Sequence, residues 1–452
     1  MNYDSAVRYL HSLGRELAAP TQAAAAKFDL ENISVLANRL GRPDRAYPNI
    51  HIAGTNGKGS TAAFLEAILR RAGFRTGLYT SPHLERINER IRINGQEIAD
   101  AAFAGVFSRI QALIEELLAE GKLRAHPTFF ECVTALAFEA FAQSKVEFGV
   151  FEVGLGGRLD ATNILAPAVC VITRIGFDHE NYLGHSLREI ASEKAGILKP
   201  GTPVVVAGQH PEALEVVLAR AQQVGAPVME TQKEFRLEEI AFGNEGCARA
   251  EAVERTTGKK WRMAPPLPGR FQVENASNAL GAARLLQRRG FLITDAAIEE
   301  GISSVEWPGR LERLASRPDI YLDGAHNPAA ARELAEFLER NFGGHRIRLL
   351  FGALRDKAVD EVAGILFPHA DEVVFTEPRT SRAISAARLA EIAGHHAARF
   401  STVPNAEEAF DRVLAESTPS DAIFVTGSLY LVGQLRRHWR MREKIRTKLA
   451  VR

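Results

Sequence analysis

The strongest indication of the fold comes from residues 49–72, NIHIAGTNGKGSTAAFLEAILRRA. The apolar run Asn49–Ala53 has the length of a buried strand, and Thr61–Ala72 repeats apolar residues at helical spacing. A glycine-rich turn that contains Lys58 separates the two segments. A strand, a glycine-rich turn and a helix in this order are typical of a phosphate-binding loop in an α/β protein.

The residue types of this turn suit a nucleotide. Glycines let backbone N–H groups point at phosphate oxygens, and the helix that follows adds partial positive charge. Lys58 can reach the β- and γ-phosphates, and Ser60 offers a hydroxyl to Mg²⁺. The predicted ATP contacts on the loop are Asn56, Gly57, Lys58, Gly59 and Ser60. Because the glycine spacing departs from the general P-loop pattern, a turn that merely caps a helix is the alternative.

Short apolar runs and helical patterns alternate along the rest of the chain, which predicts parallel sheets. In the first part, strands are expected at Thr76–Tyr79, Val146–Val153, Ala168–Thr173 and Val204–Ala207. In the last part, they are expected at Ile320–Leu322, Arg346–Phe351, Glu372–Phe375 and Ala422–Val425. Residues 228–265 show short alternating stretches, so a small β-rich excursion is expected there. We predict a P-loop parallel-sheet ATPase domain over residues 1–304 and a smaller Rossmann-like α/β domain over residues 305–452.

The overall charge excludes some partners. The 452 residues include 56 Lys and Arg and 55 Asp and Glu, so neither a nucleic acid nor an anionic membrane is expected to bind. Three scattered cysteines and the lack of a signal-like or membrane-spanning apolar run predict a cytoplasmic protein. Residues 436–452 carry eight Lys or Arg and one acid. We interpret them as a solvated basic helix, with a partner-binding tail as the alternative.

Several further motifs follow the phosphate loop. They are YTSPHL (Tyr79–Leu84), EVGLGGRLDATN (Glu152–Asn163), FDH (Phe177–His179), SEKAGILK (Ser192–Lys199) and DGAHNP (Asp323–Pro328). Together with GTNGKGS, and in this order, they resemble the folylpolyglutamate synthase/dihydrofolate synthase family of the Mur ligase superfamily. The resemblance implies an ATP-dependent ligase that adds L-glutamate to dihydropteroate and/or to tetrahydrofolate (poly)glutamate through an acyl phosphate. We expect the protein to be a monomer.

The metal ligands are predicted from two sources. Glu152 ends an expected strand beside glycines, which by itself suits Mg²⁺, whereas the imidazole of His179 is a softer ligand than Mg²⁺ prefers. The resemblance implies that Glu152, His179 and Ser81 hold one metal ion and that Ser60 serves a second. It also implies a CO₂-derived carbamate on Lys194, whose carboxylate would belong to this metal site. The alternative for Lys194 is an exposed helix lysine.

The resemblance implies further contacts with ATP at Asn278, Arg310 and Asp323. An asparagine can hydrogen-bond to the edge of a base, and an arginine can bind phosphate through two hydrogen bonds. An aspartate can accept a hydrogen bond from a ribose hydroxyl. His326 is expected to approach the γ-phosphate or the acyl phosphate, with a helix-capping histidine as the alternative. Lys58, Lys194 and His326 are therefore the predicted catalytic residues.

Two segments match the family's contacts with the pterin-side substrate. They contain Thr128, Phe129, Phe130 and Glu131, and Leu159, Asp160 and Ala161. Without the resemblance, the two phenylalanines would be interpreted as core residues. Some relatives carry serine where this chain has Ala161, so the substrate preference stays open. The alternatives for the whole chain are a Mur-type amino-acid ligase for another carboxylate and a nucleotide-binding regulator without a ligase step.

Overall fold

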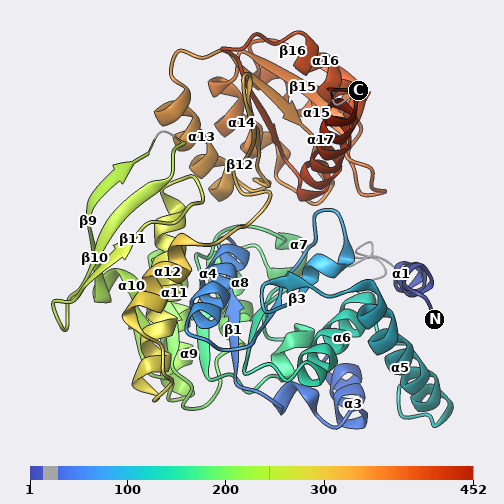
Figure 1. The fold of residues 1–452 in the computed structure, drawn as a ribbon, viewed down its shortest axis with the longest axis vertical. Coiled ribbons are helices and arrows are strands. Elements are labelled where there is room, and N and C mark those ends of the chain that lie inside the picture. Colours follow the sequence, from blue (N-terminus) through green and yellow to red (C-terminus); the bar gives the residue numbers. More distant parts are fainter. Residues whose placement is uncertain (14–28, 244, 451–452) are drawn as a thin grey trace.

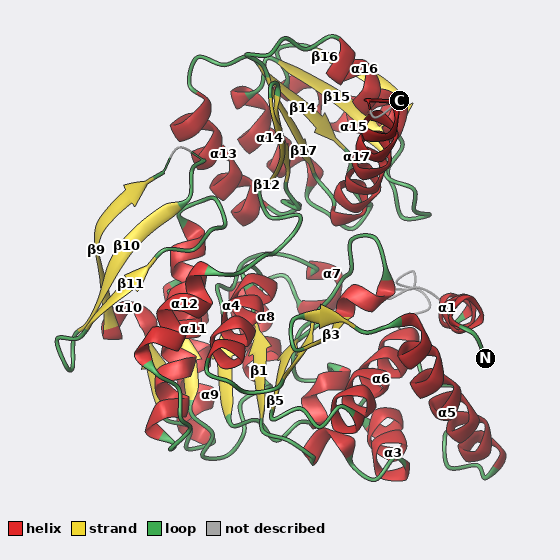
Figure 2. Cartoon of the chain, in the orientation of Figure 1, coloured by secondary structure: helices red, strands yellow, loops and turns green. Residues whose placement is uncertain are grey.

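The chain folds into two lobes, each built around a largely parallel sheet (Figure 1). The computed structural model describes residues 1–13, 29–243 and 245–450, and its side chains up to residue 446. The first lobe holds an eight-stranded sheet and the second a six-stranded sheet. A third, three-stranded sheet lies along one side of the molecule (Figure 2).

The eight-stranded sheet has the strand order β4-β3-β2-β5-β1-β6-β7-β8. Its strands are β1 (Asn49–Ala53), β2 (Thr76–Tyr79), β3 (Ile91–Ile93), β4 (Gln96–Glu97), β5 (Phe148–Glu152), β6 (Val169–Ile172), β7 (Val204–Val206) and β8 (Val228–Glu230). The strands from β2 to β8 along this order are parallel, while β3 and β4 form an antiparallel edge. β1 is buried along its whole length because helices cover both faces of the sheet.

The helices of the first lobe surround this sheet. They are α1 (Tyr3–Ser12), α3 (Glu31–Arg39), α4 (Lys58–Arg71), α5 (Asp100–Ala119), α6 (Phe129–Gln143), α7 (Glu180–Leu183), α8 (Leu187–Ala195), α9 (Pro211–Gln223), α10 (Thr231–Glu234), α11 (Phe271–Arg288) and α12 (Asp295–Ser303). α4 packs between the sheet, α11 and α12. At Gly301 of α12, an ideal Cβ would lie 2.5 Å from the Cα of Ile68. The helix that follows the phosphate loop is thus fixed by tight backbone packing.

The small sheet consists of β9 (Phe235–Phe242), β10 (Ala248–Glu254) and β11 (Lys260–Met263), paired antiparallel. It packs against α11 and α12, with Trp261 and Met263 pointing into the core. It falls within residues 228–265, where the sequence indicates a β-rich excursion. β8, at the start of that range, instead belongs to the main sheet.

The six-stranded sheet has the order β12-β13-β17-β14-β15-β16. Its strands are β12 (Glu312–Ser316), β13 (Asp319–Leu322), β14 (Ile347–Phe351), β15 (Glu372–Glu377), β16 (Phe400–Asn405) and β17 (Ala422–Thr426). The helices of this lobe are α13 (Pro328–Phe342), α14 (Val359–Leu366), α15 (Ala386–Ala393), α16 (Ala406–Ala415) and α17 (Leu429–Ala450). Only β12 is antiparallel to its neighbour. The predicted fold class, a P-loop parallel-sheet domain followed by a Rossmann-like α/β domain, is confirmed.

The chain passes from the first lobe to the second between the end of α12 at Ser303 and the start of β12 at Glu312. The predicted division at residues 304 and 305 is compatible with this course. Among the described residues, none of the helices combines the length and the apolar character that a membrane crossing requires.

Candidate active site

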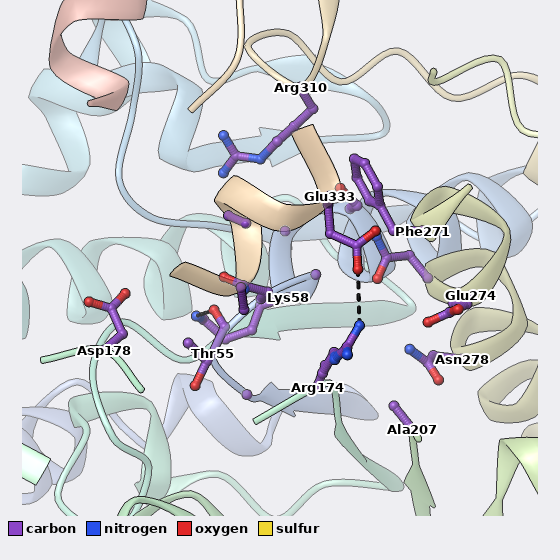
Figure 3. Close-up of a pocket in the computed structure, with 18 of the residues that line it drawn as sticks. Thr55, Lys58, Arg174, Asp178, Ala207, Phe271, Glu274, Asn278, Arg310 and Glu333 are labelled. Carbon is purple, nitrogen blue, oxygen red and sulfur yellow. Dashed lines mark hydrogen bonds and ion pairs between the residues drawn. The ribbon is translucent and has the colours of Figure 1, made fainter. Parts of the chain in front are cut away.

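A cavity of about 480 Å³ lies between the two lobes (Figure 3). Its first-lobe wall is formed by the loops at the carboxyl ends of the parallel strands, where α/β proteins bind their ligands. Every predicted catalytic, ATP-binding and metal-binding residue lines this cavity: Asn56, Gly57, Lys58, Gly59, Ser60, Ser81, Glu152, His179, Lys194, Asn278, Arg310, Asp323 and His326. Residues as far apart in sequence as Asn56 and His326 thus share one site.

Two glycines let the phosphate loop approach its neighbours closely. Gly54 has φ +151°, and an ideal Cβ there would lie 1.9 Å from Oγ1 of Thr173. Gly57 has φ +84°, and its Cβ would lie 2.2 Å from Oδ1 of Asn275. The backbone N–H groups of Thr55 and Asn56 donate to the carbonyl of Arg174 at 2.9 and 3.1 Å. The turn is therefore braced against the loop after β6 and the start of α11.

Lys58 places a cation at the first turn of α4. Its Nζ donates to the carbonyl of Thr55 at 3.0 Å, so the side chain folds back over the loop. Burial lowers the pKa of Lys58, although the nearby carboxylate of Glu152 acts in the opposite direction. A bound polyphosphate would stabilise the charged form of this partly buried ammonium.

Glu152 and Ser81 come together from the ends of β5 and β2. Oε2 of Glu152 accepts a hydrogen bond from the backbone N–H of Ser81 at 3.0 Å. An ideal Cβ at Gly59 would lie 3.4 Å from the same oxygen, so the start of α4 also faces this carboxylate. Burial raises the pKa of Glu152. A divalent cation would stabilise such a buried carboxylate, and the oxygens of Glu152, Ser81 and Ser60 are the ligands that Mg²⁺ prefers.

His179 fits the metal site less well in this conformation. Burial lowers its pKa to about 3, so the imidazole is neutral at physiological pH. Its Nε2 lies 3.2 Å from Nζ of Lys357, and this ammonium also donates to Asp178 at 2.7 Å. Nδ1 of His179 is buried and has no hydrogen-bond partner among the described residues. Metal binding through Nε2 would first require Lys357 to move, so the metal role of His179 stays a prediction.

Lys194 is buried, and the alternative of an exposed helix lysine is wrong. It lies near the end of α8, and its Nζ donates to the carbonyl of Gly54 at 2.8 Å. Burial, followed by the charge of Lys58, lowers the pKa of Lys194 to about 7. A large fraction of this amine is therefore neutral near physiological pH, directly behind the phosphate loop.

The second lobe contributes Asp323, Arg310 and His326. Both oxygens of Asp323 accept backbone hydrogen bonds at 2.9 Å, from Leu311 and Ala325, which fixes the carboxylate at the end of β13. Arg310 enters the cavity from above (Figure 3), and its Nη1 donates to its neighbour's carbonyl, Gly309 O, at 3.2 Å. A carboxylate and a guanidinium thus face the phosphate loop from across the cavity.

His326 connects the lobes rather than capping a helix. Its Nδ1 lies 2.7 Å from the carbonyl of Gly324, and its Nε2 lies 3.3 Å from Oδ2 of Asp178. The cap of α13 is Asn327, whose Oδ1 accepts from Ala330 N, so the helix-capping alternative for His326 is wrong. Burial would raise the pKa of Asp178, but the His326 hydrogen bond and the charge of Lys357 lower it well below its usual range.

The far end of the cavity suits a planar base. Asn278 of α11 is buried there, with Ala207 and Glu274 as its labelled neighbours (Figure 3). Its Oδ1 accepts a hydrogen bond from Oγ1 of Thr231 at 3.4 Å, which orients the amide. The NH₂ group can then donate to the edge of a base.

Sequence reasoning missed the residues that join the lobes around the cavity. Arg174 Nη1 pairs with Glu333 Oε1 at 2.9 Å, as the dashed line in Figure 3 shows. The amides of Asn56 and Asn327 donate to each other at 3.2 and 3.0 Å. Asn327 lies within the motif DGAHNP, which could have indicated its role. The pair of Arg174 and Glu333 has no comparable signal in the sequence.

The predicted pterin-side residues are not among the described residues that line the cavity. Thr128 and Glu131 form the capping box that starts α6. Phe129 is buried, with the guanidinium of Arg90 5.4 Å from its ring centre. Phe130 lies directly behind the cavity wall, since an ideal Cβ at Gly154 would lie 2.5 Å from its Cζ. Their substrate contacts stay predictions.

Asp160 supports the glycine-rich loop after β5. One of its oxygens accepts from the backbone N–H groups of Gly154 and Leu155, both at 3.0 Å, and the other accepts from Thr162 N at 3.0 Å. Leu159 is partly buried and Ala161 buried beside it. The buried carboxylate of Asp160 therefore shapes a loop that lines the cavity.

A phosphate loop in one parallel-sheet lobe, facing a second α/β lobe across a single cavity, is the architecture of a Mur-type ligase. Residues 52–283 match the family described as Mur ligase middle domain, and residues 309–429 match the family described as Mur ligase, glutamate ligase domain. The chain is also 36% identical over 415 residues to a dihydrofolate synthase/folylpolyglutamate synthase of Bacillus subtilis, a match that covers 90% of this chain and 94% of that relative.

Solved structures give the same result. Folylpolyglutamate synthase of Mycobacterium tuberculosis, complexed with ADP and AMPPCP, has a TM-score of 0.85 and 36% identity, covering 91% of this chain and 95% of that one. The bifunctional folylpolyglutamate synthase/dihydrofolate synthase of Yersinia pestis, complexed with AMPPNP and Mn ion, has a TM-score of 0.81 and 31% identity, covering 97% and 98%. The chain belongs to the folylpolyglutamate synthase/dihydrofolate synthase family, which confirms the family predicted from its motifs.

Proposed function

We propose that the protein uses ATP to join L-glutamate to dihydropteroate and also to tetrahydrofolate (poly)glutamates. Membership of the family supports the ligase activity. The observation that carries the assignment is the single cavity into which both lobes direct the predicted ATP-binding and catalytic residues. A nucleotide-binding regulator would not need residues such as Lys194 and His326 beside the phosphate loop.

The reaction requires activation, because a carboxylate has no usable leaving group. A carboxylate oxygen attacks the γ-phosphorus of ATP, which gives an acyl phosphate and ADP. The glutamate amine then attacks the acyl carbon, and the amide forms as phosphate leaves and the amine loses a proton. In this scheme Lys58 and Arg310 would neutralise phosphate charge, and His326 would contact the acyl phosphate. Bound Mg²⁺, held by oxygens of Ser60, Ser81 and Glu152, would supply further charge neutralisation.

Exclusion of water is the second requirement, since an acyl phosphate hydrolyses easily. The contacts between Arg174 and Glu333 and between Asn56 and Asn327 hold the lobes together on the nucleotide side of the cavity. Such a closed site protects the intermediate until glutamate attacks it. We further propose that the protein acts as a monomer in the cytosol, in keeping with three cysteines that are all free thiols.

The assignment is tested with two acceptors. Purified protein with MgATP and glutamate should release phosphate in step with amide product when either dihydropteroate or tetrahydrofolate is present. Product is measured by mass spectrometry and phosphate by a coupled assay. Phosphate release that needs neither glutamate nor a pterin would indicate a regulatory ATPase. Amide product with only one acceptor would restrict the protein to one of the two activities.

Asn278 offers a test of the nucleotide orientation. Replacing Asn278 with alanine should raise KM for ATP about tenfold and leave kcat nearly unchanged, because a hydrogen bond to the base is equally strong before and during the reaction. Steady-state kinetics of amide formation measure both constants. Asn38→Ala, on an exposed part of α3, is the matched control. A fall in kcat with unchanged KM would place the base elsewhere.

A further inference from the structure

The last helix of the chain touches the loop that carries Ser81. Gly433 of α17 faces Leu84 so closely that an ideal Cβ at Gly433 would lie 2.0 Å from the Leu84 carbonyl oxygen and 2.6 Å from its carbon. Real Cβ atoms essentially never come within 3.0 Å of another heavy atom, so only glycine permits this contact. The backbone of the C-terminal helix therefore rests directly on the backbone of Leu84, which lies in the loop of residues 80–86 in the other lobe.

The side chain of Leu84 packs against apolar residues of the second lobe. It packs against the core cluster that contains Val432 and Leu435. An ideal Cβ at Gly309 would lie 3.0 Å from Cδ1 of Leu84, and Gly309 belongs to the segment that connects the lobes. A partly buried residue of the first lobe thus packs against the connecting segment and α17.

Ion pairs surround this contact. Nη1 of Arg436 donates to Glu85, and Nη1 of Arg440 donates to the same carboxylate at 3.3 Å. Nε of Arg436 donates to both oxygens of Glu312 at 2.8 and 2.9 Å. The side chain of Glu85 is only 11% exposed, so solvent screens these pairs less than it screens ordinary surface pairs. Part of the basic C-terminal stretch therefore has its partners inside the molecule.

The Ser81 loop can transmit a displacement at Leu84. The carboxylate of Glu89 accepts from the backbone N–H groups of Leu84, Glu85 and Arg86 at 2.7, 2.9 and 2.8 Å, which makes this part of the loop rigid. Ser81 lies three residues before Leu84, and its backbone N–H donates a hydrogen bond to the carboxylate of Glu152. A movement of α17 would therefore shift Ser81 relative to Glu152.

We propose that Gly433 and Arg436 are positioning residues for the ligase reaction: through Leu84 and Glu85, α17 sets the place of the Ser81 loop at the phosphate end of the cavity. The proposal rests on the proposed function of that cavity. It gives the C-terminal helix a role that the sequence alone left open, and it couples the docking of the second lobe to the oxygens that would hold Mg²⁺.

Gly433→Ala tests the backbone contact. The added Cβ must move away by about 1 Å or more, and a displacement of about 1 Å near reacting groups can lower a rate about 100-fold. We expect kcat/KM for MgATP to fall about 100-fold and the Mg²⁺ concentration for half-maximal rate to rise. Gly105→Ala is the matched control, since a Cβ at this helical glycine of α5 would meet nothing within 4 Å. That variant should behave as wild type.

Arg436→Gln provides a second variant in case Gly433→Ala does not fold. Titration calorimetry with MgADP, which needs no turnover, should show about tenfold weaker binding for Arg436→Gln and partial recovery for Arg436→Lys. Arg442→Gln, which removes a pair with Asp411 within the second lobe, should bind normally. If Arg436→Gln binds MgADP and responds to Mg²⁺ like wild type, the proposal is wrong. Wild-type protein that binds MgADP but forms no amide would instead contradict the proposed function.

Discussion

Replacing Lys58 with methionine is expected to lower kcat/KM for amide formation about 1,000-fold. Lys58 is a partly buried cation at the phosphate loop, and its charge would offset the negative charge that spreads over the transferred phosphoryl group. Methionine keeps a similar length and apolar volume but removes this charge. Initial rates of amide and phosphate formation, measured together, give the size of the loss.

The same variant should remain folded. Because burial lowers the pKa of Lys58, the charged form is less favourable inside the protein than in water, so its removal should not lower the melting temperature. Lys122→Met, which removes an exposed pair with Glu120, is the control for a surface lysine and should keep full activity. Activity of Lys58→Met within tenfold of wild type would show that phosphate binds elsewhere.

The central strands of both sheets were predictable from the sequence. β1, β5, β14 and β17 are buried along their whole length, so apolar residues predominate in them. The edge strands β12 and β16 gave no such signal, because most of their residues are exposed or only partly buried. The sequence therefore indicated the layers of each lobe but not the full width of either sheet, since β3, β4 and β8 of the first sheet were not predicted as its strands.

The candidate site was predictable where a motif carries it. Lys58, Glu152 and Asp323 follow strands and stand in recognisable motifs, so their meeting at one cavity could be expected. The residues that contact these motifs from distant parts of the chain could not be predicted, because only the tertiary fold brings them close. Lys357, which contacts Asp178 from 179 positions away, is one example.

Lys194→Ala is the second variant for which we expect a large loss, about 100-fold or more in kcat. We propose that Lys194 carries a carbamate, formed when its neutral amine attacks CO₂ and releases a proton. The amine is buried behind the phosphate loop, and burial with the charge of Lys58 lowers its pKa to about 7. A lowered pKa means that the neutral form is present above about pH 7. The carbamate fraction should therefore rise with pH through that value and with the supply of CO₂.

Two measurements separate this modification from a merely structural lysine. Acetate or formate should restore part of the activity of Lys194→Ala, because a small carboxylate can occupy the space that the side chain leaves. Wild-type protein exposed to ¹³CO₂ should show a carbamate carbon by NMR, and Lys194→Ala should lack it. Lys199→Ala is the matched control, because burial also lowers the pKa of Lys199 while its Nζ donates to Asn163. The Lys199→Ala protein should therefore still show the labelled carbamate carbon. Full activity of Lys194→Ala without added carboxylate would contradict the proposal, because the phosphate site would then need no charge from this residue.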